Sequence, residues 1–135
     1  MSLPPLSFTF DEKSVGNLTL SHEQQKLFHR FENTENHPFI TGKAGTGKSV
    51  LLQYIKLNTK KKIVVVAPTG VAALNVGGQT IHSLFLLPPS FIDVSSLKVS
   101  RRNANILQSI DTLVIDEVSM VRADVMDGID HVLRQ

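Results

Sequence analysis

A short glycine-rich stretch has the spacing of a loop that binds phosphate groups. Residues 42–49 read GKAGTGKS and fit the pattern G-x-x-x-x-G-K-[ST]. Glycines let a backbone wrap a compact anion with successive N–H groups pointing inward, and the helix that follows turns its positive end toward the same anion. We therefore predict a nucleoside-triphosphate site. Its predicted binding residues are Gly42, Ala44, Gly45, Thr46, Gly47, Lys48 and Ser49.

Two side chains at the end of this stretch would act directly on the nucleotide. Lys48 can reach the β- and γ-phosphates, and the Ser49 hydroxyl can ligate the Mg²⁺ that accompanies ATP. Residues 37–41 are predicted to form a short buried strand entering the loop, and residues 50–55 a helix leaving it. A chance glycine turn before a Lys-Ser pair would lack this strand–loop–helix setting. ATP and Mg²⁺ are therefore the predicted cofactors.

A second chemical signal is a pair of acids after an apolar run. Residues 111–115 predict a buried strand, and Asp116 and Glu117 follow it directly. Many strands end this way, but this pair lies beyond Lys48 with one strand–helix unit between, where a Walker B element is expected. Asp116 would then bind Mg²⁺ through water, and Glu117 would polarise the attacking water. With Lys48, these acids are the predicted catalytic residues.

The stretch between the two signals predicts another strand and two turns into helices. Residues 62–67 predict a strand buried on both faces. Thr69 follows it and could hold an anion, either ATP or a nucleic-acid phosphate, or could simply belong to an ordinary strand-to-helix turn. Thr80 or Gln79 is predicted to cap a further short helix, on which His82, as a lone histidine, is expected to be structural.

The N-terminal part offers an arm and a helix start. Residues 1–19 are predicted to be a short strand or an extended arm packed on a domain formed by residues 20–135. Ser21 is a good helix N-cap, and Gln24 three residues later completes a capping box. The amide of Gln24 could instead bind the edge of adenine. These two interpretations carry equal weight, and one amide is not expected to serve both well.

The remaining segments are predicted to be structural. Residues 86–103 resemble a surface segment, whose basic residues Lys98, Arg101 and Arg102 are solvated or touch a phosphate backbone. Residues 125–133 predict an amphipathic helix with one buried face. Its predicted apolar face consists of Val125, Met126, Ile129, Val132 and Leu133.

Composition narrows the class of protein. The 135 residues suffice for one domain or part of one, and 41% apolar with 19% charged residues is ordinary for a soluble globular chain. A formal charge of +2 does not indicate nucleic-acid binding, and residues 60–62 are interpreted as a solvated helix end. The lack of cysteine suits a reducing compartment. No apolar run is long enough for a membrane span and no secretory signal is visible, so we expect an intracellular location.

Several strings occur together in an order that resembles one family. They are FITGKAGTGKS at residues 39–49, APTGVAA at 67–73, TIHS at 80–83 and IDEVSM at 115–120. The set resembles the ATPase half of the petite-integration-frequency (PIF) helicases, the superfamily-one group that includes RecD-like enzymes. Residues 20–24 resemble that family's Q motif. The resemblance covers residues 20–134.

The resemblance implies an ATP-driven DNA helicase that tracks single or forked strands 5′ to 3′, in repair, recombination or telomere maintenance. It assigns Gln24 to adenine and supports the phosphate, Mg²⁺ and water roles given above. It also places Thr69, Gly70, Thr80 and His82 near DNA. The fold it implies is a three-layer α/β RecA-like P-loop NTPase domain with a mainly parallel sheet, incomplete at its C-terminus, whose partner would be a second RecA-like domain after Gln135.

That fold would leave a gap in the sheet between the strand before the phosphate loop and the Walker B strand. We expect the gap to close by direct pairing, by insertion of the N-terminal arm, or by a strand from a second copy in a homodimer. The chain alone is expected to bind nucleotide weakly and to show little activity. The alternative functions are an ATPase that remodels protein or DNA without unwinding, and a nucleotide or single-strand binding module without turnover. Glu117 argues against the latter, because a module without turnover needs no water-activating acid.

Overall fold

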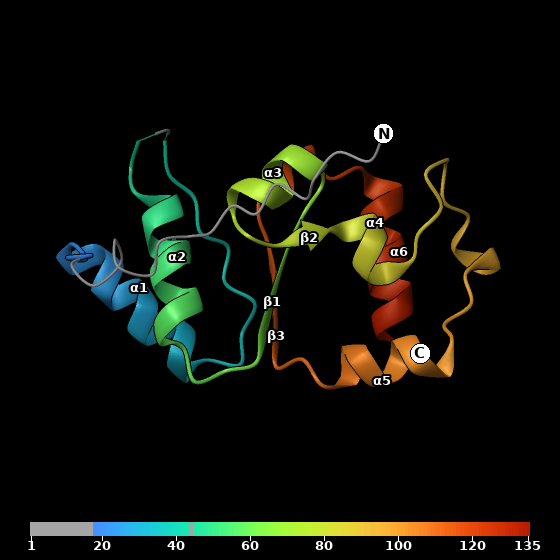
Figure 1. The fold of residues 1–135 in the computed structure, drawn as a ribbon, viewed down its shortest axis with the longest axis horizontal. Coiled ribbons are helices and arrows are strands. Elements are labelled where there is room, and N and C mark those ends of the chain that lie inside the picture. Colours follow the sequence, from blue (N-terminus) through green and yellow to red (C-terminus); the bar gives the residue numbers. More distant parts are fainter. Residues whose placement is uncertain (1–17, 44) are drawn as a thin grey trace, which may run out of the picture. The chain divides into compact units, whose positions relative to one another are not determined.

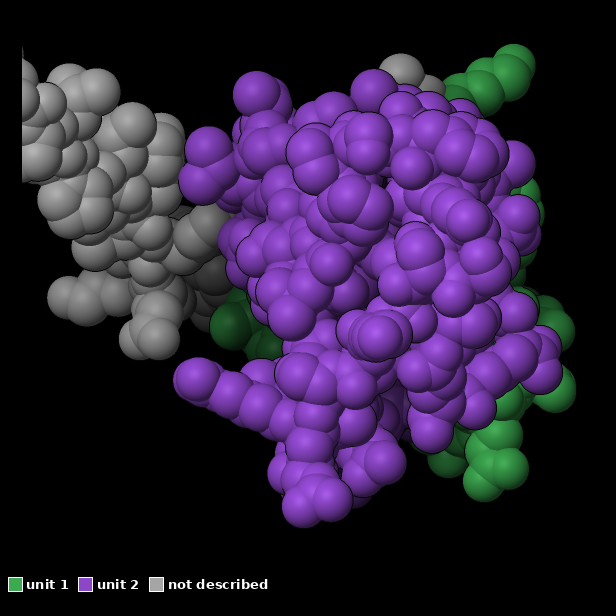
Figure 2. Space-filling model, turned by 90° about the vertical axis from the view of Figure 1, so that its right-hand side faces the viewer, with its two compact units in different colours: residues 1–58 green, residues 59–135 purple. Residues whose placement is uncertain are grey.

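The computed structural model describes residues 18–43 and 45–135, which fall into two compact units coloured separately in Figure 2. The first unit is Met1–Asn58 and the second is Thr59–Gln135. The predicted N-terminal arm and Ala44 lie outside the described residues. Within the described ranges, each helix is too short or too polar to serve as a membrane span.

The first unit is built on helices α1 (His22–Asn33) and α2 (Lys48–Asn58). Ser21 Oγ accepts a hydrogen bond from the Gln24 N–H at 3.2 Å, and Gln24 Oε1 accepts one from the Ser21 N–H at 2.8 Å. The predicted capping box is therefore confirmed. Helix α2 confirms the helix predicted after the loop, and the rings of Phe28 on α1 and Tyr54 on α2 meet edge to face, with centroids 5.0 Å apart.

The strand predicted before the phosphate loop is absent from the described residues. Residues 37–43 belong to no helix or strand, and the side chain of Phe39 is 74% exposed, so the prediction of a short buried strand is wrong. A strand is defined by hydrogen bonds to a neighbouring strand, and the described sheet contains no pairing with these residues. Direct pairing across the predicted gap is therefore not observed either.

The second unit contains a sheet of three parallel strands (Figure 1). The strand order is β2 (Gln79–Thr80), β1 (Ile63–Ala67), β3 (Thr112–Ile115). Strand β1 confirms the strand predicted at residues 62–67, and its last three residues are buried. Strand β3 confirms the predicted Walker B strand but is only half-buried, because it pairs with β1 alone in the described sheet.

The helices of the second unit surround a continuous apolar core. They are α3 (Gly70–Asn75), α4 (Ile81–Phe85), α5 (Arg101–Gln108) and α6 (Ala123–Leu133), with short 3₁₀ turns at Val94–Ser96 and Val118–Met120. The buried cluster joins side chains from β1, α4, the segment after α4, and α6. Its members are Val66, Ile81, Leu84, Phe85, Leu87, Ile92, Val125, Ile129 and Val132.

Two of the structural predictions for this unit need correction. The segment at residues 86–103 is not purely a surface segment, because Leu87 and Ile92 are buried in the core and helix α5 begins at Arg101. Helix α6 forms as predicted, but Leu133 at its end is 53% exposed rather than part of the buried face. Both differences concern side chains whose burial depends on distant partners.

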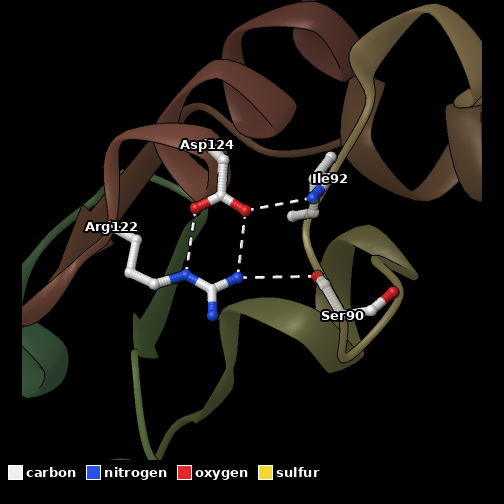
Figure 3. Close-up of polar contacts among 4 residues, drawn as sticks. All are labelled: Ser90, Ile92, Arg122 and Asp124. Carbon is white, nitrogen blue, oxygen red and sulfur yellow. Dashed lines mark hydrogen bonds and ion pairs between the residues drawn. The ribbon is translucent and has the colours of Figure 1, made fainter.

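The Arg122–Asp124 ion pair lies at the start of α6, and hydrogen bonds of its two side chains hold the segment after α4 (Figure 3). Arg122 Nε and one terminal nitrogen donate to the two carboxylate oxygens of Asp124 at 3.0 and 2.9 Å, and Asp124 also accepts the Ile92 N–H at 3.0 Å. The same guanidinium donates to the Ser90 carbonyl at 3.5 Å. The hydrogen bonds from Arg122, followed by the one from Ile92, hold the pKa of the Asp124 carboxyl below its usual value.

Candidate nucleotide-binding site

The phosphate loop depends on glycines at defined positions. Gly45 has a φ of +79° and Gly47 one of +88°, in the left-handed region that favours glycine. A Cβ on Gly42 would lie 2.5 Å from the Thr46 hydroxyl oxygen. These three positions therefore accept larger residues only if the loop changes shape.

Polar contacts inside the loop hold its first half. The Thr46 N–H and hydroxyl both donate to the Lys43 carbonyl, at 3.2 and 2.6 Å. The Lys48 ammonium donates to the carbonyls of Gly42 and Lys43, the latter at 3.2 Å. The ammonium thus lies against the loop that precedes it, and a bound phosphate would compete with these carbonyls for its protons.

The start of α2 supplies further donors for an anion. The first intrahelical bond runs from the Leu51 N–H to the Gly47 carbonyl at 3.0 Å, so the N–H groups of Lys48, Ser49 and Val50 have no partner within the helix. The first turn of α2 carries no acidic residue that would repel an anion, and Ser49 is exposed. Free N–H groups, an ammonium and a hydroxyl are a donor set that fits a triphosphate with Mg²⁺.

Gln24 touches both the α1 cap and the phosphate loop. Its Oε1 accepts the Ser21 N–H, and its Nε2 donates to the Gly47 carbonyl at 3.0 Å. Only the capping interpretation is confirmed, and the adenine role stays a prediction. A primary amide has two N–H donors and two acceptor lone pairs, so these contacts leave one of each. The expectation that one amide does not serve both the cap and adenine well stays a prediction.

The second unit gathers the other predicted site residues at one end of its sheet. Thr69 follows β1, Thr80 ends β2, and Asp116 follows β3, where its N–H donates to the Val66 carbonyl at 2.9 Å. The hydroxyls of both threonines act as helix caps: Thr69 accepts the Ala72 N–H, and Thr80, rather than Gln79, accepts the Ser83 N–H, each at 3.2 Å. The strand-to-helix turn predicted as the ordinary role of Thr69 is thus confirmed.

The other residues at this end differ in exposure. Glu117 is exposed and Asp116 is half-buried. His82 on α4 is half-buried, so it is not a core histidine, and a Cβ on Gly70 would meet no atom within 4 Å. DNA contact by these residues stays a prediction. The predicted phosphate-binding residues belong to the first unit and the two acids to the second.

The backbone of Glu117 is a feature that sequence reasoning missed. Its φ of +52° and ψ of +42° place it in the left-handed region, which few residues other than glycine and asparagine adopt without cost. Strained backbone of this kind concentrates at functional sites. No sequence signal could have indicated it, since glutamate has no preference for this conformation. Among the described residues, no group of histidines and acids has the arrangement of a metal site.

Comparisons with known proteins identify the family to which the chain belongs. The family model described as PIF1-like helicase matches residues 19–135. The ATP-dependent DNA helicase PIF1 of Saccharomyces cerevisiae is 38% identical over 127 residues, which cover 87% of this chain and 15% of that protein. The chain thus spans a small part of its relative's length.

Solved structures give the same likeness. Unliganded Pif1 from a Bacteroides species is 44% identical with a TM-score of 0.77, and the match covers 87% of this chain and 28% of that one. The Bacteroides Pif1 helicase in complex with ADP-AlF3 and single-stranded DNA is 42% identical, with a TM-score of 0.78 and the same coverage. These matches confirm the predicted RecA-like α/β fold with a parallel sheet.

Proposed function

The chain belongs to the PIF1-like helicase family, and we propose that it carries the ATP-binding part of an ATP-dependent DNA helicase. The observation that carries the proposal is the loop at residues 42–49. This loop contains two glycines with left-handed backbone, and the Lys48 ammonium lies against it. The loop is followed directly by α2, whose first N–H groups have no partner within the helix. Residues 20–135 are proposed to form part of one RecA-like domain.

The proposed division of labour follows from the donors and acceptors in each unit. The loop N–H groups and Lys48 bind the phosphates, and Gln24 binds the adenine edge with the N–H and lone pair that its present contacts leave over. Ser49 and Asp116 hold Mg²⁺, the latter through water, and the metal neutralises charge on the phosphates. Glu117 orients the attacking water and accepts its proton.

DNA is the proposed partner of the carboxyl end of the sheet. Thr69 and Thr80 lie there at the N-terminal ends of two helices, with Gly70 and His82 beside them in sequence. The single-stranded DNA in the complex of the Bacteroides relative supports DNA as a partner. Tracking would run 5′ to 3′ on single or forked strands, inside the compartments that hold DNA, in repair, recombination or telomere maintenance.

The second RecA-like domain and a second copy of the chain are the other proposed partners. In the described sheet, β3 pairs on one side only, which supports strand exchange between two copies. A single monomeric species in sedimentation velocity would contradict the exchange.

Unwinding by the whole protein tests the proposed function. We expect ATP hydrolysis to rise when single-stranded DNA is added, and a forked duplex with a 5′ tail to be separated. Lys48→Ala should abolish both, since it removes the charge that binds the phosphates. DNA-stimulated hydrolysis without strand separation would instead assign the protein to remodelling, and binding without hydrolysis would assign it to a module without turnover.

A further inference from the structure

One side-chain amide joins the N-terminal ends of α1 and α2, the two helices among the described residues of the first unit. Gln24 Oε1 accepts the Ser21 N–H at 2.8 Å, and Gln24 Nε2 donates to the Gly47 carbonyl at 3.0 Å. Turning the amide over would set Oε1 against a carbonyl and Nε2 against an N–H, which would break both bonds. Its two partners therefore fix the orientation of the amide.

The Gly47 carbonyl is the acceptor that begins helix α2. It accepts the Leu51 N–H at 3.0 Å as well as the Gln24 amide, so both of its lone pairs are used. Its bond to Leu51 directs the carbonyl along the helix. In the trans peptide that links Gly47 to Lys48, the Lys48 N–H points the opposite way, out of the helix end toward the loop.

We propose that Gln24 is a positioning residue for the phosphate loop. It acts through the Gly47 carbonyl, and this effect does not depend on which base the nucleotide carries. By holding that carbonyl, it fixes the direction of the Lys48 N–H, one of the donors that a phosphate needs. The inference rests on the proposed function, because it concerns the same nucleotide site. It differs from the adenine role in that it also applies to a ligand without a base.

Glycine at position 47 leaves room for the Gln24 amide beside the loop backbone. A Cβ on Gly47 would lie 2.5 Å from Gln24 Nε2, and the φ of +88° independently favours glycine. The contact is partly buried, which shields it from competition by water. A side chain at position 47 would therefore displace the Gln24 amide.

Base-free ligands separate positioning from base recognition. Calorimetric titrations of the full chain with Mg²⁺ complexes of ATP, GTP and inorganic tripolyphosphate would compare wild type with Gln24→Ala. We expect Gln24→Ala to weaken the binding of GTP and tripolyphosphate by roughly fivefold, which is typical for one hydrogen bond, and to weaken that of ATP by at least as much, since the proposed adenine contact is lost as well. A loss confined to ATP would overturn the proposal and leave Gln24 with the base alone.

Two neighbouring variants control for damage to α1. Gln25 lies on the same helix, and its side-chain amide donates to the Leu20 carbonyl at 3.2 Å. Gln25→Ala therefore removes a comparable hydrogen bond to another backbone carbonyl. Ser21→Ala removes the hydroxyl of the capping box but keeps the Gln24 side chain. Both variants should bind tripolyphosphate within about twofold of wild type. If Ser21→Ala weakens binding as much as Gln24→Ala, the effect runs through helix stability and the proposal fails.

Hydrogen exchange in the ligand-free chain gives an independent readout. In Gln24→Ala the Leu51 amide should exchange faster, because its acceptor carbonyl has lost an anchor, while in Gln25→Ala it should exchange as in wild type. If wild type binds none of the three ligands, the proposed nucleotide site fails. The exchange rate of Leu51 still decides this inference, since an unchanged rate in Gln24→Ala would overturn it.

Discussion

Each of the two units of the chain is stabilised internally by a different kind of interaction. The second unit has a sheet and a buried cluster that spans β1, α4 and α6. Among the described residues of the first unit, which carries the phosphate loop, the buried apolar side chains come from the α1 region and α2 and no strand is present. Its loop is held instead by hydrogen bonds from Gln24, Thr46 and Lys48.

This difference suits the roles proposed for the two units. A loop that must exchange its own carbonyl contacts for phosphate contacts cannot be locked by apolar packing. Hydrogen bonds at partly exposed groups open and close more easily than a buried core. The sheet end in the second unit, where Asp116 and Glu117 lie, rests on a core that resists such opening.

The largest expected effect is the loss of a core side chain from the second unit. Ile81 is fully buried, and Ile81→Ala should reduce the free energy of unfolding by about 3 kcal/mol through lost burial and a cavity. Leu51 on α2 is 2% exposed and is the matched position in the first unit. Leu51→Ala should cost about 2 kcal/mol, because Leu51 lies outside the large buried cluster.

Amide hydrogen exchange resolved by residue checks this pair. Ile81→Ala should lower protection mainly in residues 59–135, and Leu51→Ala mainly in α1 and α2. If both variants lost amide protection equally in both units, the units would share one core, and the proposed difference between them would be wrong.

A smaller effect is expected from the ion pair at the start of α6. The Asp124 side chain is 10% exposed, whereas Asp130, paired with Arg134, is 60% exposed. Asp124→Asn should therefore destabilise the second unit more than Asp130→Asn, since exposed pairs contribute little. Chemical unfolding of both variants beside wild type measures the difference.

The pH dependence of this effect has a defined sign. Because folding lowers the pKa of Asp124, the pair contributes stability above the unfolded value, about 4, and this contribution is lost as the pH falls through the folded value. The gap in unfolding free energy between wild type and Asp124→Asn should thus narrow from about pH 6 to about pH 3. If the difference in unfolding free energy between wild type and Asp124→Asn stays constant with pH, the charge of Asp124 does not contribute to stability.

The smallest expected effect is a gain in stability at Glu117. Asparagine tolerates the left-handed region better than glutamate, so Glu117→Asn should raise the free energy of unfolding by about 0.5 kcal/mol. Leu86, with a φ of +53°, is a matched position away from the acids, and Leu86→Asn should give a similar gain. Only Glu117→Asn should also abolish ATP hydrolysis. A loss of stability in Glu117→Asn would indicate that the glutamate side chain holds the turn.

Local patterns predicted much of the fold correctly. The Ser21 capping box, the Thr80 cap and the apolar run of β1 depend on neighbours along the chain, and all are confirmed. The phosphate loop followed by α2 is equally local, since the glycine spacing itself permits the left-handed turns.

Features that depend on distant partners could not be predicted in this way. Residues 37–41 have the composition of a strand but lack a strand to pair with in the described sheet, and Leu133 continues the apolar stripe of α6 without a surface to cover it. The hydrogen bond from Gln24 to Gly47 joins residues 23 positions apart, so no local sequence pattern predicts it. The left-handed Glu117 is likewise a product of its surroundings.

Binding of Mg²⁺-ATP by wild type, Lys48→Ala and Lys43→Ala tests the central claim most directly. Lys43 has the same charge and lies in the same loop, but it occupies a variable position of the motif. We predict that wild type and Lys43→Ala bind with similar affinity and that Lys48→Ala loses at least about tenfold, because one charge-assisted contact to phosphate is removed. Equal binding by all three chains, or binding by none, would contradict the assignment of residues 42–49 as the nucleotide site.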